Sequence, residues 1–442
     1  MRTAQTAEEL GRQVEHRREP VRSLLARALQ ALDDAAIDWA LLREPAAATA
    51  GDVDLLVADG DVRRLERVLA PLGFAEVPAW GRGSHRFFVG CDGGGSWVEL
   101  DVVTELAYGP RFAIPTRAAE ACLGRRTRSG GVARLNPNDS FWTLLFHCAL
   151  DRSGDTGRHG PQLRSLAHMA ERGGELPSLL DRYGGEGSAA AAVAAARNGD
   201  GRRLHELGRQ VLLGYAARHP FSLCRQLVVG SAKARTRRIH ALMRRRGPRI
   251  ALLGPDGAGK STLAAALESS FFFPVRTFYA GLSKQDPRKR RLMPVPGLRL
   301  ARLLVRLRWL SLLAGIHQAN GGVAVFDRYT YDAWLQPGAS APLRLRRWAL
   351  LHGCRRADLA VLLDADGETM HQRKDEFTTD ELETQRRRFL ALADRIPELV
   401  IVDARQPEEV VLRTVTAHVW DAHVRRLRRQ RGGRSSRPRA ES

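Results

Sequence analysis

The chain has 442 residues, of which 44% are apolar and 27% charged, and its formal net charge is +21. This length exceeds what one hydrophobic core normally serves, and the composition excludes a chain that is disordered throughout, so two or three folded domains are expected. The excess of arginine suits nucleic acid or phosphorylated ligands, but few aromatic residues interleave with it, which favours charge spread over solvated surfaces.

Cysteine usage and hydropathy indicate the compartment. The five cysteines form no CxxC pair, which argues against a zinc site or a disulfide framework and fits a reducing environment. The first residues lack the apolar core of a signal peptide, and no run of about 18 uncharged apolar residues predicts a membrane span. We therefore expect a cytoplasmic protein.

The first part of the chain alternates short apolar runs with helical stretches. Apolar periodicity and bounding turn residues predict helices over 21–34 and around 63–69, and strands over Asp38–Leu42, Asp52–Val57, 85–90 and 96–103. This pattern indicates a mixed α/β domain over residues 1–135.

The middle of the chain, residues 136–246, has a helical pattern and is predicted to be a connector domain. Asn138 or Asp139 is expected to cap its first helix, ahead of the apolar positions that follow. Its alanine run at 189–196 is predicted to be helical.

From Arg249 onward, short apolar runs alternate with helical stretches, and the predicted strands are "RIALL", "TFYAG", "VAVFD", "LAVLLD" and "LVIVDA". Continuous apolar strands of this kind are typical of a parallel sheet covered by helices on both faces. We expect a three-layer αβα domain over residues 247–425. The last residues, 426–442, are predicted to be a disordered basic tail.

The stretch "GPDGAGKST" lies between an apolar strand and a predicted helix, and it fits the phosphate-loop pattern G-x-x-x-x-G-K-[ST]. Glycine N–H groups can close around phosphate oxygens, Lys260 neutralises the β and γ phosphates, and Ser261 supplies an oxygen to Mg²⁺. The pattern predicts binding of ATP and Mg²⁺. The nucleotide-binding residues expected in this loop are Gly254, Gly257, Gly259, Lys260, Ser261 and Thr262.

Residues 248–420 resemble thymidylate kinases and the wider nucleoside-monophosphate kinase group. The resemblance rests on "GPDGAGKST", "VAVFDRYTYD", "ADLAVLLDADGETMHQRKDEFTTDELETQRRRFLALA" and "IVDARQPEEVV". It implies an ATP-dependent kinase with Mg²⁺, and a homodimer. It also implies that the Asp327 carboxylate is linked to the metal, either directly or through one of the metal's ligands. Arg328 is implied to bridge donor and acceptor phosphates, and Asp256 to face the acceptor.

The same resemblance places Arg373, Lys374 and Arg386 in a lid-like segment that closes over the transferring phosphoryl group, with Arg373 as a catalytic residue. Arg405 lies in "DARQPEEV", which is similar to the loop beside the adenine. Preorganised cations stabilise the charge that spreads over the phosphoryl oxygens during transfer. An alternative interpretation of "QRRRF" is a solvated helix face.

The segments that hold thymidine monophosphate in that family have no counterpart here, where the chain has "YAGLSKQDPRKRRLMP" and "TYDAWLQPGAS". This difference argues against dTMP as the acceptor. We expect a nucleoside monophosphate or another small phosphorylated metabolite, of which a sugar phosphate is one type.

The stretch "RLARLLVRLRWLSLLAG" carries Arg299, Arg302 and Arg306 on one helical face and leucines on another. It is compatible with a helix on a membrane surface. The favoured prediction is that it packs into the acceptor side of the kinase domain.

Two predicted strands of the N-terminal domain carry carboxylates. Asp52 and Asp54 lie two apart on one strand, hence on one face, and Asp101 lies on another. Such a set can hold two Mg²⁺ ions. Residues 20–170 resemble the nucleotidyltransferase fold of the DNA polymerase β superfamily, although Arg43 and Glu44 stand where that superfamily has a glycine. An active metal site and a degenerate structural domain both remain open.

Two other functions fit the same sequence. One is a nucleic-acid end-processing enzyme, in which a polynucleotide kinase and a nucleotidyltransferase act on one strand bound by basic residues. The other is a non-catalytic regulator that binds ATP without consuming it. The favoured reading of the chain is a phosphate-loop kinase fused to a nucleotidyltransferase-like domain.

Overall fold

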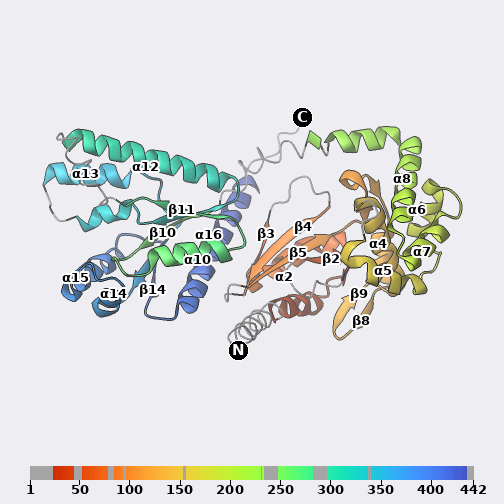
Figure 1. The fold of residues 1–442 in the computed structure, drawn as a ribbon, viewed down its shortest axis with the longest axis horizontal. Coiled ribbons are helices and arrows are strands. Elements are labelled where there is room, and N and C mark those ends of the chain that lie inside the picture. The colour runs from red at the N-terminus through yellow and green to blue at the C-terminus, as the bar shows by residue number, and fades with distance from the viewer. Residues whose placement is uncertain are drawn as a thin grey trace, which may run out of the picture. The chain divides into compact units, whose positions relative to one another are not determined.

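The computed structural model describes residues 23–43, 52–77, 84–92, 96–152, 156–229, 231–232, 247–281, 296–336, 338 and 340–435. The chain forms two compact units (Figure 1). Unit 1 comprises Met1–Asp92 and Ser96–Arg237, and unit 2 comprises Gly93–Gly95 and Arg238–Ser442. Unit 1 therefore contains both the mixed α/β part and the helical part that follows it.

Unit 1 is built on a seven-stranded sheet with the order β3-β4-β5-β2-β1-β9-β8. Strands β2 and β5 at its centre are parallel, and β1 pairs antiparallel with β2. The strands are β1 (Trp39–Leu41), β2 (Asp52–Val57), β3 (Phe74–Val77), β4 (Arg86–Cys91), β5 (Trp97–Val103), β8 (Thr127–Ser129) and β9 (Val132–Arg134). A small pair, β6 (Ala107–Tyr108) and β7 (Ile114–Pro115), follows β5.

The helices of unit 1 lie in two groups along the chain. Residues 23–34 form a helix before β1, and α2 (Val62–Leu69) lies between β2 and β3. The later helices are α3 (Ala118–Gly124), α4 (Pro137–Phe146), α5 (Gly160–Leu166), α6 (Glu175–Gly184), α7 (Ser188–Asn198), α8 (Gly201–Arg218) and residues 220–229. A π-helical turn, His147–Asp151, directly continues α4. The predicted alanine helix corresponds to α7.

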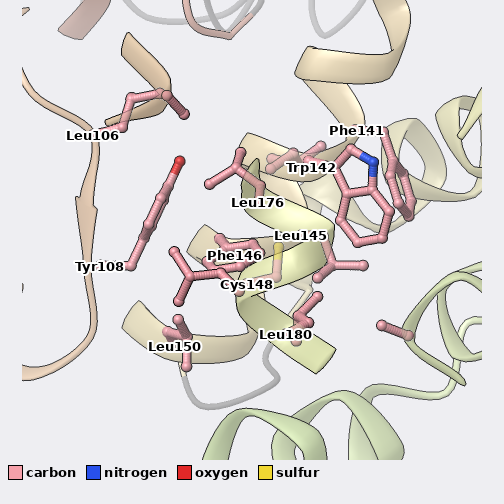
Figure 2. Close-up of a cluster of buried hydrophobic side chains, with 14 of the residues drawn as sticks. Leu106, Tyr108, Phe141, Trp142, Leu145, Phe146, Cys148, Leu150, Leu176 and Leu180 are labelled. Atoms are coloured by element: carbon pink, nitrogen blue, oxygen red, sulfur yellow. The ribbon is translucent and has the colours of Figure 1, made fainter. Parts of the chain in front are cut away.

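Each face of the unit 1 sheet packs in its own core. Side chains of residues 23–34 and of α2, such as Leu32 and Leu65, pack against one face. The later helices pack against the other face, which contributes Ala40 and Leu56. Figure 2 shows part of this second core, in which Tyr108 lies beside Phe146 with ring centroids 5.0 Å apart. Burial on both sheet faces explains why one compact unit spans the strands and the helices.

The cap of α4 differs from the prediction. Asn136, not Asn138 or Asp139, is the N-cap, and its side chain accepts a hydrogen bond from the backbone N–H of Asp139. Pro137 occupies the first helical position, where its missing N–H would have had no partner within the helix. The proline therefore sets the start of the helix two residues earlier.

Unit 2 contains a five-stranded parallel sheet with the order β11-β12-β10-β13-β14. Its strands are β10 (Arg249–Leu253), β11 (Val275–Tyr279), β12 (Val323–Asp327), β13 (Leu359–Asp364) and β14 (Leu399–Asp403). The register pairs the last residues Tyr279 with Asp327, and Asp364 with Asp403. The carboxyl ends of the strands consequently meet at one edge, which confirms the predicted α/β class with a parallel sheet.

Helices cover both faces of this sheet, giving three layers (Figure 1). Helices α10 (Lys260–Ser270) and α16 (Glu408–Ser435) pack together on one face. On the other face, α12 (Pro296–Ala319), α13 (Ala341–Leu351) and α15 (Thr379–Leu390) contribute to a shared core, and α14 (Gly367–Arg373) precedes α15. Leu303, Leu307 and Leu310 of α12 pack in that core.

The prediction of a disordered tail from residue 426 is wrong for residues 426–435, because α16 continues to Ser435. Val424 and Leu427 are buried, and Arg426 forms an ion pair with Asp358. These contacts hold a segment that composition alone marks as too polar to pack. Residues 436–442 lie outside the described part of the chain.

None of the helices that the structure describes is long and apolar enough to cross a lipid bilayer.

Candidate functional site

A glycine-rich loop joins β10 to α10 at the carboxyl edge of the unit 2 sheet. Gly254, Gly257 and Gly259 have φ angles of 139°, 86° and 90°. Side chains other than glycine rarely adopt such angles. A Cβ atom at Gly257 would lie 2.5 Å from the carbonyl oxygen of Met370, so close packing also requires glycine there. The loop therefore has the backbone conformation that its sequence predicts, and it leads directly into the helix N-terminus at Lys260.

Lys260 is buried at the start of α10, and its Nζ atom donates to the carbonyl oxygen of Pro255 at 2.6 Å. Burial, together with the nearby Arg328, lowers the pKa of Lys260 to about 8, although surrounding carboxylates oppose this shift. A desolvated ammonium favours a nearby negative charge. The structure therefore places the Lys260 ammonium within the phosphate loop, beside the carbonyl oxygen of Pro255.

Ser261 and Asp327 meet at the ends of α10 and β12. The Ser261 hydroxyl donates to Asp327 Oδ2 at 2.7 Å. A hydroxyl and a carboxylate at a phosphate loop provide the hard oxygen donors that Mg²⁺ prefers. These residues therefore fit the metal that the loop implies. Thr262, one residue further along α10, is exposed beside them.

Arg328 follows β12 with a left-handed backbone, φ 65°. Its guanidinium pairs with Asp256 of the phosphate loop. Burial alone would raise the pKa of Asp256, but the attraction and hydrogen bond of Arg328, with help from Lys260 and Lys374, hold that pKa below its usual value. The structure therefore brings Asp256 and Arg328 together, as the resemblance implies for two residues that act on one acceptor.

Asp332 is a residue of this site that the sequence analysis did not assign. Its Oδ2 atom lies 3.8 Å from Arg328 Nη1, and the residue is only 7% exposed. Neither of its carboxylate oxygens has a hydrogen-bond partner among the described residues. Burial raises the pKa of Asp332 to about 6, despite the opposing attraction of Arg328 and Lys260. The signal available in the sequence was an aspartate inside the aromatic stretch "YTYDAW", where an isolated charge is costly.

The arginines predicted for the lid and for the adenine loop contact residues at the ends of β13 and β14. Arg373 donates to the carbonyl oxygen of Ala404 at 3.0 Å. Arg386 forms two hydrogen bonds with Asp364 at 2.6 and 2.9 Å, which hold α15 at the end of β13. Arg405 pairs in the same way with Asp403, at the end of β14. Arg373 and Arg386 thus join helices α14 and α15 to strand ends, whereas Arg405 pairs with the strand that directly precedes it.

Lys374, which the resemblance also places in the lid, forms an exposed ion pair with Glu376 at 3.0 Å.

In unit 1, the register of β2 and β5 places Asp54 directly beside Asp101, and Asp52 beside Glu99. Asp54 forms an ion pair with Arg43 at 3.1 Å. Asp101 is buried and contacts His85 Nδ1 at 2.8 Å. The side chain of Asp52 lies outside the described atoms.

Among the side chains that are described, no group of three or more His, Cys, Asp or Glu residues is arranged to hold a metal ion. Of the carboxylates on this strand pair, Asp54 contacts an arginine and Asp101 contacts a histidine.

No family model and no curated protein matches the chain. Among solved structures, it is similar to a thymidylate kinase from Candida albicans, with 21% identity over 40% of this chain and 90% of that one, at a TM-score of 0.30. A deoxyadenosine kinase from M. mycoides with dCMP and dCDP bound matches 38% of this chain and 96% of its own, with 14% identity and a TM-score of 0.29. A second structure of that kinase, with bound dATP, matches 36% of this chain and 92% of its own, with 14% identity and a TM-score of 0.26. At these identities and TM-scores, the similarities do not establish the family of the chain.

Proposed function

We propose that unit 2 is an ATP-dependent phosphotransferase that acts on a small molecule. The observation that carries this proposal is the contact between Ser261 and Asp327, formed beside the buried Lys260 on a loop with three left-handed glycines. A strand-to-helix turn that served only structure would need neither the buried ammonium nor the carboxylate opposite the serine.

Each residue of the site has a distinct role in this proposal. The loop N–H groups and Lys260 hold the donor phosphates, while Ser261 and Asp327 would hold Mg²⁺, which neutralises charge on the phosphate oxygens. Arg328 lies where the phosphoryl group is transferred, and Asp256 fixes its orientation. Arg405 lies in the loop after β14, and Arg373 at the end of α14 donates to the same loop, so both would lie beside the adenine of the bound nucleotide.

The acceptor in this proposal is a nucleoside monophosphate or another small phosphorylated metabolite. The chain departs from the thymidine-binding segments of thymidylate kinases, and it places the buried Asp332 within the second of the two stretches that replace them. dTMP is therefore not expected to be the best acceptor.

The test incubates the full chain with γ-labelled ATP, Mg²⁺ and a panel of nucleoside monophosphates, sugar phosphates and 5′-hydroxyl oligonucleotides. Lys260→Ala is expected to lower transfer by at least about a hundredfold, and the exposed Arg387→Ala is the matched control. Label transfer that survives in Lys260→Ala would show that the site is misassigned. ATP binding without transfer to any acceptor would instead support a regulator, and oligonucleotides as best acceptors would support end processing.

A second function, nucleotidyl transfer by unit 1, is favoured by the register that aligns Asp54 with Asp101 on parallel strands. Asp54 and Asp101 lie side by side, and Asp52 is on the same strand as Asp54. This arrangement suits a two-metal site if metal ions replace Arg43 and His85 as the partners of the two carboxylates. Mn²⁺ titration of the full chain, followed by electron paramagnetic resonance, tests this: Asp101→Asn should remove one class of bound Mn²⁺. An unchanged titration in that variant would mark unit 1 as structural.

A further inference from the structure

Arg328 is held between two carboxylates. Its guanidinium pairs with Asp256 through Nη2, and its Nη1 lies 3.8 Å from Asp332 Oδ2. Both contacts hold the guanidinium beside the phosphate loop, to which Asp256 belongs. Its single positive charge is therefore already balanced by the protein.

Carboxylates also surround the other cation of the site. Lys260 and Arg328 are the buried or half-buried cations, whereas Asp256, Asp327 and Asp332 all influence Lys260 electrostatically. Before Mg²⁺ and nucleotide bind, three carboxylates thus face these two cations and the more exposed Lys374. An acceptor phosphate placed next to Asp332 would bring a second negative charge beside a buried carboxylate.

The carboxylate of Asp332 also has no hydrogen-bond donor among the described residues. It is buried beside Arg328, but 3.8 Å is too long for a hydrogen bond, and neither carboxylate oxygen has another partner in the described residues. Buried acceptors in folded proteins almost always receive a hydrogen bond. A hydroxyl group supplies one, and an ionised phosphate does not.

We propose that the reacting group of the acceptor is a hydroxyl that donates to Asp332, so that the product is a phosphate ester and not a phosphoanhydride. This inference rests on the proposed kinase function and narrows its acceptor to a metabolite with a free hydroxyl beside Asp332, such as a sugar phosphate. The transfer balances as follows. The hydroxyl oxygen bonds to the γ phosphorus while the bond from that phosphorus to the bridging oxygen breaks, ADP leaves with the electron pair, and the proton passes to the Asp332 carboxylate.

The charge around Asp332 is compatible with this role. Burial makes its carboxyl a stronger proton acceptor than an exposed aspartate, while Arg328 and Lys260 moderate the effect. Asp256 is held ionised by Arg328 and is a poorer proton acceptor. Asp327 is engaged by the Ser261 hydroxyl. Among these carboxylates, Asp332 is the most buried, and neither of its oxygens has a hydrogen-bond partner in the described residues.

The decisive experiment is phosphorus NMR of the product made by the full wild-type chain from ATP, Mg²⁺ and each acceptor of the panel. A new phosphate ester resonance is the expected result, whereas a new phosphoanhydride pair overturns the inference and leaves the proposed kinase function intact. If no acceptor is phosphorylated, the proposed function fails, and the inference fails with it.

The variant Asp332→Asn keeps the shape of the side chain and removes its ability to take a proton. We expect kcat to fall by about 10²- to 10⁴-fold with the KM for ATP unchanged. Calorimetric binding of the acceptor without ATP should weaken about tenfold, while binding of ATP alone should not change. The control is Asp375→Asn, whose side chain is 88% exposed. Wild-type kcat and acceptor affinity in Asp332→Asn would overturn the inference.

Discussion

The Ser261 hydroxyl donates to Asp327 Oδ2 at 2.7 Å, although the two residues are 66 positions apart in the chain. The contact exists because β10 and β12 are adjacent parallel strands, so that the helix following one strand begins beside the end of the other. A helix N-terminus and a strand-end carboxylate are thereby brought to one point.

The first prediction concerns this pair. Asp327→Asn retains an oxygen that accepts from Ser261 but loses the negative charge, so Mg²⁺-dependent binding of ATP should weaken about 10- to 100-fold. Calorimetry with Mg²⁺ and with EDTA measures the difference, and the exposed Asp394→Asn serves as control. Equal loss of affinity in EDTA would place the effect of Asp327 on the fold and not on metal.

The second prediction concerns the phosphate loop backbone. Gly257→Ala combines a φ of 86° with a 2.5 Å approach to the Met370 carbonyl, so we expect loss of ATP binding and a lower melting temperature of unit 2. Gly173→Ala, where no atom lies within 4 Å of the added Cβ, should leave both unchanged. Differential scanning fluorimetry with and without ATP distinguishes the two. Wild-type ATP binding by Gly257→Ala would contradict the described loop conformation.

The third prediction follows from the lowered pKa of Lys260, which is about 8. Near this pH part of the free protein carries a neutral amine, and bound phosphates favour the charged form, so ATP binding should take up a proton. Calorimetry at pH 8.0 in buffers with different ionisation enthalpies detects the uptake. Lys260→Met should abolish it, and a buffer-independent enthalpy for the wild type would show that Lys260 is fully charged before binding.

The fourth prediction concerns stability and pH. Because the pKa of Asp332 is raised to about 6, the folded state retains a proton that the unfolded state releases between about pH 4 and pH 6. The unfavourable contribution of Asp332 therefore grows through that window and is complete above it. Asp332→Asn should be as stable as wild type near pH 4 and more stable at pH 7.5, by at most about 3 kcal/mol.

Chemical denaturation of unit 2, followed at both pH values, checks this order. An Asn variant that is less stable than wild type at pH 7.5 would mean that Asp332 makes a compensating contact in the folded protein.

The fifth prediction concerns Arg386, whose two hydrogen bonds to Asp364 hold α15 against β13. Both side chains are about a quarter exposed, so solvent screening limits their contribution to about 1 kcal/mol. Arg386→Gln should accelerate hydrogen exchange in α15 about fivefold. Arg387→Gln, with a side chain that is 80% exposed, should not. Unchanged exchange in Arg386→Gln would show that apolar packing alone holds α15.

Much of this fold follows from local sequence. Strands β10, β12 and β13 of unit 2 were predicted closely because they are buried on both faces, which favours nearly continuous apolar runs. The edge strand β14 is more exposed, but its apolar run also predicted it. The glycine loop was equally clear, since its backbone angles exclude most other residues. Strand β3 and the pairs β6–β7 and β8–β9 were not predicted, because short, partly exposed strands depend on partners that are distant in the sequence.

The site was predictable only where one residue type is required. Lys260 and Ser261 follow from the loop pattern, whereas the pairings of Arg373 with Ala404 and of Arg386 with Asp364 depend on how helices dock on strand ends. Asp332 was missed because its significance is its burial next to Arg328, which no spacing in the chain reveals. The tail was misjudged because its many arginines obscure the buried Leu427, which follows the buried Val424 on the same helix.

The ion pair of Arg426 with Asp358 has a consequence for synthesis on the ribosome. Asp358 also accepts from the backbone N–H of Arg249, at the start of the central strand and 109 residues earlier, while Arg426 is 68 residues later. The first strand of unit 2 to be synthesised, β10, is thus anchored through Asp358, which also pairs with the last helix, α16. A nascent chain therefore completes this anchor only after Arg426 has left the exit tunnel, and a protein shortened to residue 425 would be released from the ribosome without it.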